Sequence, residues 1–252
     1  MPLAQEKIEA RLSPAVLDEL LALWQAEQGA EKGRDLDLLA ATLPFPQGAR
    51  LRVLDLGCGP GDAGRAVHAR YSGSKIDCLD RDVFLLAMCA AVNRRAAIPG
   101  SHLVRDLWDE SWSTDLQPGY DVAAAANTLH WLGAQRIQEV CRDVFRLLRS
   151  GGVFIAVEPS EAEPAFAACF AQWKSRQPSR YCRENWQRFW DRANEILGYN
   201  HIPFLRSPIA RAPGAGEMPV SAWMAALRNA GFESLDVLLR DKDEVLLAAV
   251  KP

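Results

Sequence analysis

The chain has 252 residues, of which 49% are hydrophobic, so it can bury a full core, and we expect one domain with an elaboration. Its 29 lysines and arginines face 32 acidic residues, and the net charge of −3 gives no overall basic field to attract nucleic acid or an anionic membrane. No apolar run approaches the length of a transmembrane helix, and the N-terminus lacks the layout of a signal peptide. The six cysteines are scattered without metal-ligand spacing, as in a reduced cytoplasmic protein.

The first 48 residues are predicted to be helical. Ser13 before Pro14 is typical of a helix N-terminus, and an apolar stripe follows at Leu17, Leu20, Leu21 and Trp24. Gly29 and Gly33 are expected to end this helix, and a shorter helix should follow before Pro44. We interpret the segment as a cap that packs on the core or covers a ligand site, and the two interpretations are compatible.

From residue 51 onward, strands and helices alternate, which is typical of a doubly wound parallel sheet. Strands are expected at 51–56, 75–80, 102–104, 120–126 and 153–158, with helices at 62–71, 83–95 and 134–148, the last closed by Gly151 and Gly152. The proline-rich residues 159–216 interrupt the alternation, with helix-like runs at 164–176 and 183–197. A helix at 220–230, a strand at 232–239 and a hairpin into 244–250 complete the chain.

A glycine-rich turn joins the first strand to the first helix of the alternating region. It reads Val53-Leu54-Asp55-Leu56-Gly57-Cys58-Gly59-Pro60-Gly61-Asp62. Such a turn lets the backbone approach a ligand and presents unpaired N–H groups to it. Residues 59–64 also satisfy the dinucleotide pattern G-x-G-x-x-G. Asp55 and Asp62 flank the loop, however, and two carboxylates would repel a pyrophosphate while attracting a cationic ligand.

The same run resembles motif I of the class I S-adenosylmethionine (SAM)-dependent methyltransferases, whose cofactor carries an ammonium and a sulfonium group. The resemblance covers about residues 50–158 and 218–250. It implies an α/β fold with a doubly wound, seven-stranded Rossmann-like sheet whose last strand is antiparallel. The expected division is an N-terminal helical cap (1–48), a SAM-binding core (49–158), a helical substrate-lid insertion (159–217), and a C-terminal helix and hairpin (218–252) that complete the core.

Two further acids match positions of the family. Asp80 ends the second strand about twenty residues after the loop, where a carboxylate can accept from both ribose hydroxyls, and Asp82 is the alternative. The resemblance places Asp106 against the adenine amino group, with the next backbone N–H reading a ring nitrogen. The predicted cofactor-binding residues are Asp55, Gly57, Cys58, Gly59, Gly61, Asp80, Arg81, Asp106, Leu107 and Asn127.

The fourth strand leads into Asn127-Thr128-Leu129-His130-Trp131-Leu132. This run resembles the form found in small-molecule methyltransferases related to trans-aconitate and biotin-pathway carboxyl methylation, and it lacks the N-P-P-Y or D-P-P-Y signature of enzymes that methylate base amines. His130 is the candidate general base, because imidazole titrates in the working pH range, although a helix-capping or wall role explains it as well. The predicted acceptor-binding residues are His130, Trp131, Glu158, Trp186, Trp190 and Tyr199.

The sequence therefore predicts a SAM-dependent methyltransferase that acts on a small metabolite, as a monomer or homodimer, without a metal ion and without a nucleic-acid or membrane partner. A methyltransferase acting on RNA or protein, and an enzyme that cyclises SAM itself, are the alternatives. A nicotinamide dehydrogenase is disfavoured by the two carboxylates at the loop. The acceptor atom stays open, since oxygen, nitrogen, carbon and sulfur acceptors share this scaffold.

Overall fold

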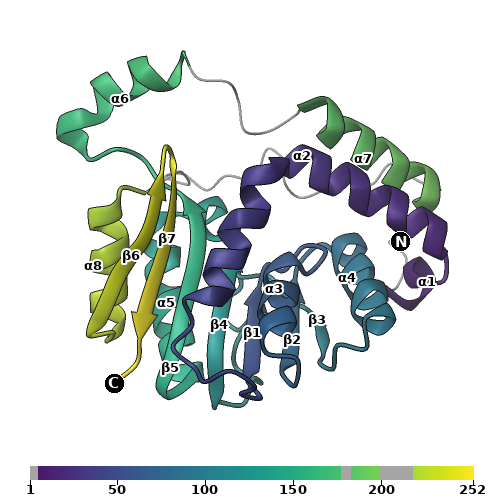
Figure 1. Ribbon diagram of the computed structural model, residues 1–252, viewed down its shortest axis with the longest axis horizontal. Coiled ribbons are helices and arrows are strands. Elements are labelled where there is room, and N and C mark those ends of the chain that lie inside the picture. The colour runs from purple at the N-terminus through teal and green to yellow at the C-terminus, as the bar shows by residue number, and fades with distance from the viewer. Residues whose placement is uncertain (1–4, 177–182, 199–217) are drawn as a thin grey trace.

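A seven-stranded sheet forms the centre of the molecule in the computed structural model, which describes residues 5–176, 183–198 and 218–252. The strand order is β3-β2-β1-β4-β5-β7-β6 (Figure 1). The strands are β1 (Arg52–Leu56), β2 (Lys75–Asp80), β3 (His102–Val104), β4 (Tyr120–Ala126), β5 (Leu148–Pro159), β6 (Ser234–Asp241) and β7 (Glu244–Val250). The first five strands are parallel, and β7 runs antiparallel between β5 and β6. This confirms the predicted fold class.

Helices α5 (Ala134–Leu147) and α8 (Val220–Ala230) pack on one face of the sheet. Their buried residues, such as Val140 and Trp223, form a cluster with Leu54, Ala123 and Phe154 of the central strands. The small alanines of β4 let the helices on both faces approach the sheet closely, and a strand covered on both faces is expected to be apolar throughout.

Helices α3 (Asp62–Arg70) and α4 (Val83–Arg95) cover the opposite face, together with the C-terminal half of α2 (Pro14–Ala41). Helix α2 is continuous, and Ser13 caps it by accepting from the Val16 N–H at 3.4 Å. The predicted break at Gly29 and Gly33 is therefore wrong. Each glycine costs a helix about 1 kcal/mol, which is less than the gain from burying Leu36 and Leu39 further along the same helix.

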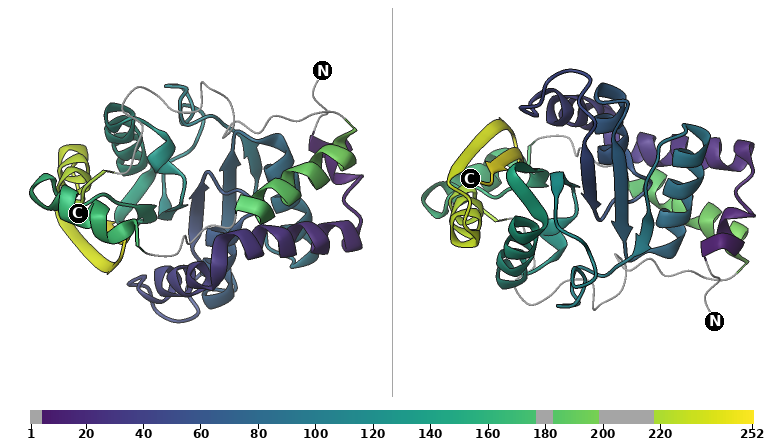
Figure 2. Two further views of the ribbon diagram at one scale, coloured as in Figure 1. Left: turned by 90° about the horizontal axis from the view of Figure 1, so that it is seen from above. Right: turned by 90° about the horizontal axis from the view of Figure 1, so that it is seen from below.

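The N-terminal half of α2 forms a separate apolar cluster with α1 (Gln5–Glu9), α4 and α7 (Arg183–Leu197). Figures 1 and 2 show α7 lying beside this half of α2. The rings of Trp24, Phe84, Phe189 and Trp190 meet there at centroid distances between 4.9 and 6.2 Å. The cap and the insertion, which are distant in sequence, thus share one core.

Two further boundaries differ from the prediction. β5 begins directly after α5, so Gly151 and Gly152 lie within the strand and do not end the helix. The run at 164–176 contains a short 3-10 helix, η2 (Pro164–Phe166), and α6 (Ala167–Lys174), which buries no residue and extends away from the sheet (Figure 1). None of the helices in the described residues combines the length and apolar character that crossing a membrane requires.

Candidate functional site

The glycine loop lies at the carboxyl end of β1, next to β4, where the strand order reverses. In doubly wound sheets this edge is the usual place for a ligand. Gly57 and Gly61 have φ angles of 58° and 90°, a region that favours glycine. A Cβ at Gly57 would lie 2.1 Å from Thr128 Cγ2, and one at Gly61 would lie 2.6 Å from Cys89 Sγ. The loop therefore needs glycines both for its backbone conformation and for its close packing.

Asp80 holds the loop from the second strand. Its Oδ2 accepts from the Gly59 N–H and its Oδ1 from the Asp82 N–H, both at 2.8 Å. The side chain is nearly buried, and burial, followed by repulsion from Asp82, raises its pKa to about 7. Each oxygen keeps a lone pair for a ligand hydroxyl. The Asp82 carboxylate instead caps α4 by accepting from Phe84 and Leu85, so the geometry favours Asp80 over its rival.

Asp106 follows β3 and is held by two contacts. Its Oδ1 accepts from the Trp108 N–H at 3.0 Å, and Arg81 pairs with the carboxylate at 3.1 Å. Arg81 and Asp106, both predicted to bind cofactor, thus meet each other, and Leu107 beside them is buried. This pair orients the Asp106 carboxylate at the sheet edge.

The two carboxylates that flank the loop differ in charge environment. Asp55 is fully buried, burial raises its pKa, and its Oδ2 accepts from the Gly64 N–H at 2.8 Å. Asp62 is paired with Arg65 and accepts from the indole N–H of Trp24 at 2.8 Å. The field at the loop is therefore less negative than the sequence indicated, because Arg65 offsets one of the two charges.

Trp24 of α2 covers the loop, and sequence reasoning assigned it only to an apolar stripe. Its ring lies 3.4 Å from the position that a Cβ on Gly59 would take. No sequence signal connects a residue 35 positions upstream to the loop, so only the fold reveals this contact.

The loop after β4 is fixed by a buried carboxylate. Both oxygens of Glu158 accept from this loop: Oε1 from the N–H groups of Thr128 (3.0 Å) and Leu129 (2.8 Å), and Oε2 from the His130 N–H (3.2 Å). The ring Nδ1 of His130 lies 2.9 Å from the same Oε2. Glu158 thereby supports the 3-10 turn η1 (Leu129–Trp131) and sets the ring of His130. Glu158 has no exposed surface with which to contact an acceptor, contrary to the prediction, and its carboxylate is occupied by this loop and the His130 ring.

Thr128 joins this loop to the glycine loop, because its hydroxyl donates to Gly57 O at 2.9 Å. Asn127, just before it, has a φ of 53°, and its Oδ1 is buried with no hydrogen-bond partner in the described residues. The indole Nε1 of Trp108 is likewise buried and unpartnered within that part of the chain. An acceptor and a donor thus stay available at the edge where the glycine loop lies.

Three comparisons show which known proteins this chain is similar to. Residues 54–154 match the family described as "Methyltransferase domain". Residues 54–154 therefore resemble a methyltransferase domain, and the seven-stranded fold is that of SAM-dependent methyltransferases.

Relatives of this methyltransferase domain differ in their acceptors. A trans-aconitate 2-methyltransferase from Paracidovorax citrulli is 26% identical over 151 residues, which cover 57% of this chain and 54% of the relative. A ribosomal RNA small subunit methyltransferase C from Hahella chejuensis is 31% identical over 153 residues, which cover 60% of this chain and 41% of the relative. The chain thus spans about half or less of the length of these relatives. The structure of human N-acetylserotonin methyltransferase in complex with SAM aligns over 94% of this chain and 55% of that chain, at a TM-score of 0.56 and 16% identity.

SAM is the cofactor of this class of domain, and the residues present fit it. The glycines leave the loop open to close approach, Asp80 keeps acceptor capacity on both oxygens, and Asn127 and Trp108 carry unpartnered polar atoms. Cys58, also predicted to bind the cofactor, donates its N–H to Leu79 O and buries its thiol, so its contacts fix the loop to β2.

The predicted acceptor residues of the insertion lie elsewhere than expected. Trp190 is 1% exposed and packs inside the cluster of α2, α4 and α7, so it is a core residue and not a pocket wall. Trp186 is half-buried, and the centroid of its ring lies 5.8 Å from the ring centroid of Trp24. Since Trp24 covers the glycine loop, Trp186 lies on the same side of the molecule as that loop. Trp131 lies 4.8 Å from the His130 ring. Tyr199 lies outside the described residues.

Proposed function

We propose that this chain transfers the methyl group of SAM to a small-molecule acceptor, with His130 as the general base. The observation that carries the proposal is the His130–Glu158 pair at the carboxyl end of β4, tied through Thr128 to the glycine loop. A base and a cofactor loop fixed to each other by hydrogen bonds have the alignment that methyl transfer to a nucleophile requires.

The tautomer of His130 follows from its partner. A carboxylate only accepts, so Nδ1 carries the proton and donates it to Glu158 Oε2, and Nε2 keeps its lone pair. Nε2 then takes the proton of an acceptor hydroxyl or amine, and the buried Glu158 stabilises the imidazolium that forms. Glu158 is a positioning residue in this scheme, because it touches His130 and not the acceptor.

The cofactor would be held by the glycine loop, by Asp80 at the ribose hydroxyls and by Asp106 at the adenine, and bound there it supplies an electrophilic methyl group. Trp24 covers the loop and excludes water from it. The described part of the insertion, through Trp186, supports Trp24 from outside.

Methylation of RNA is the second candidate, favoured by the similarity to the ribosomal RNA methyltransferase. The residues after β4 argue for the first: Asn127-Thr128-Leu129-His130 stands where enzymes acting on base amines carry N-P-P-Y. Two relatives are trans-aconitate 2-methyltransferases, which also favours a small molecule over RNA as the acceptor.

The test is a screen that measures S-adenosylhomocysteine release with carboxylic acids, phenols, amines, thiols and ribosomal RNA as acceptors. SAM without acceptor forms a separate arm for cyclisation. We expect a small molecule to be methylated, and methylation of RNA alone, or turnover of SAM alone, would refute the proposal.

Variants of two histidines test the role of the base. His130→Asn should lower turnover by about 10²- to 10⁴-fold with little change in SAM affinity, and the acid limb of the pH–rate profile should vanish. His68→Asn, on the outer part of α3, is the matched control and should leave turnover unchanged. Near-normal turnover in His130→Asn would end the base hypothesis and indicate an acceptor that is already ionised, such as a carboxylate or thiolate.

A further inference from the structure

Three of the six cysteines meet beneath the glycine loop. Cys58 belongs to the loop, Cys78 to β2 and Cys89 to α4, and their Sγ atoms all lie within 4.8 Å of one another. All three side chains are buried. Their separation in sequence hides the group, which forms only because the parallel sheet brings the loop, strand and helix together.

One side-chain amide lies against two of the three sulfurs. Asn93 Nδ2 lies 3.6 Å from both Cys78 Sγ and Cys89 Sγ, so it is placed to donate to them. Thiolates are the form in which cysteine binds metals, and hydrogen bonds from outside the ligand set orient them.

We propose that Cys58, Cys78 and Cys89 bind one soft metal ion of the class of Cu(I). The donor set is sulfur alone, and soft thiolates select such ions. Zinc prefers four ligands in a closed tetrahedron, whereas the group found within the described residues offers three. Metal–sulfur bonds of about 2.3 Å in a trigonal plane place the sulfurs about 4.0 Å apart, so the site closes with shifts below about 1 Å.

Binding of the ion displaces the S–H protons of the ligating thiols, which leave to solvent. The site is distinct from the proposed methyl-transfer chemistry, which uses the opposite side of the loop at Thr128.

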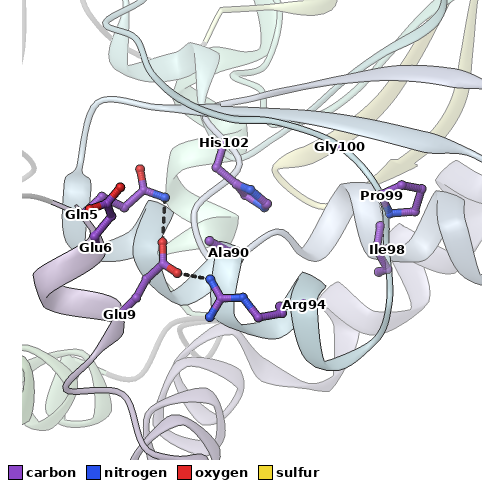
Figure 3. A pocket seen from close by; sticks show the side chains of 9 residues that line it. All are labelled: Gln5, Glu6, Glu9, Ala90, Arg94, Ile98, Pro99, Gly100 and His102. Carbon is purple, nitrogen blue, oxygen red and sulfur yellow. Dashed lines mark hydrogen bonds and ion pairs between the residues drawn. The ribbon is translucent and has the colours of Figure 1, made fainter.

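A surface hollow is linked to the cluster through one contact. A hollow of about 750 Å³ lies between α1, α4 and the start of β3, lined by Gln5, Glu9, Arg94 and His102 among others (Figure 3). His102 Nε2 is 3.1 Å from Asn93 Nδ2, the amide that contacts the two sulfurs. An imidazole at the hollow is a suitable transient ligand for an ion on its way to the thiolates.

The experiment uses the reduced, metal-free full chain with Cys169→Ser and Cys182→Ser, which removes two thiols that are not part of the proposed site. Cu(I) is titrated anaerobically against a chromogenic Cu(I) chelator, and X-ray absorption identifies the ligands. We expect one ion per chain, bound by two or three sulfurs. Cys89→Ser should lower the affinity further than Asn93→Ala, for which removal of an outer-shell partner predicts a loss of about 10- to 100-fold.

Cys141→Ser is the matched control, because Cys141 is equally buried but lies on α5 across the sheet. It should leave binding unchanged. Thermal melts of the metal-free variants confirm folding, and Cys78→Ala provides a second removal if Cys89→Ser fails to fold. Nitrogen or oxygen ligands in the absorption spectrum, or equal losses in Cys141→Ser and Cys89→Ser, would overturn the proposal whatever the methyltransferase assay gives.

Discussion

The buried carboxyl of Asp80 should make the cofactor-free protein less stable as the pH rises. Burial, with repulsion from Asp82 as the second cause, raises its pKa from 3.8 to about 7, although N–H groups of Asp82 and Gly59 and the charge of Arg81 act in the opposite direction. The folded state therefore keeps the proton at pH values where the unfolded chain has lost it. The contribution of Asp80 to the unfolding free energy is therefore highest below about pH 4 and falls until about pH 7.

The magnitude follows from the shift. About three pKa units at 1.36 kcal/mol each correspond to about 4 kcal/mol of unfolding free energy lost across this range. Asp80→Asn keeps the size of the side chain and removes the titration. The amide that Asp80→Asn introduces lowers stability by an amount that does not depend on pH, because its N–H group would face the N–H of Gly59 or Asp82. The informative quantity is therefore the change with pH in the difference between the unfolding free energies of the parent and Asp80→Asn.

The assay is urea unfolding of both proteins, without SAM, at several pH values from 4 to 8. As the pH rises from 4 to 8, the parent should lose about 4 kcal/mol of unfolding free energy relative to Asp80→Asn. Asp82→Asn should move the upper end of the range to lower pH, since it removes the repulsion. Two parallel curves for the parent and Asp80→Asn would refute the reasoning.

Further variants test the cofactor side and the supporting contacts. Asp80→Ala should weaken SAM binding by about 1.5–3 kcal/mol in calorimetric titration. Asp82→Ala should mainly lower the melting temperature, because it removes a helix cap worth about 1 kcal/mol. Equal losses of SAM affinity in the two variants would mean that Asp80 is not the ribose-binding aspartate. Glu158→Gln should reduce turnover together with the acid limb of the pH–rate profile, because the amide disturbs the Nδ1–H donor; an unchanged profile would contradict its positioning role. Trp24→Phe should reduce SAM affinity without unfolding the chain, as measured by calorimetry and thermal melts, and unchanged affinity would mean that the indole contact to Asp62 is unimportant. Trp190→Ala should lower the unfolding free energy measured with urea by about 3–5 kcal/mol, as expected for a core residue. A loss below about 1 kcal/mol would show that Trp190 is not part of the core.

The local patterns of the sheet could be predicted because they follow from short-range rules. Apolar runs such as 120–126 identify strands covered on both faces, and the glycines of 57–61 identify the loop by their conformational needs. The continuity of α2 could not be predicted, because the glycines weaken the helix locally while Leu36 and Leu39 stabilise it through contacts with distant residues.

The candidate site was predictable where it lies within one strand–loop unit, as at Asp80. It was not predictable where two units meet. Glu158 was expected to face an acceptor, but it lies beneath the neighbouring loop, and only the register of β5 against β4 reveals this. The cysteine cluster and the Trp24 contact are hidden in sequence for the same reason.

The continuous helix α2 has a consequence for how the cofactor loop is uncovered. Its 28 residues change direction part-way along (Figure 1), with Leu17, Leu20 and Trp24 anchored in one cluster and Leu36 and Leu39 in another. Gly29 and Gly33 lie between the two anchors, and within the described residues no atom outside the adjacent turns of the helix lies within 4 Å of the place where a side chain on Gly33 would begin. Because glycines weaken a helix, the segment between the two anchors is where a change in the bend of α2 would cost least, and Trp24 would then move together with α7, which shares its cluster.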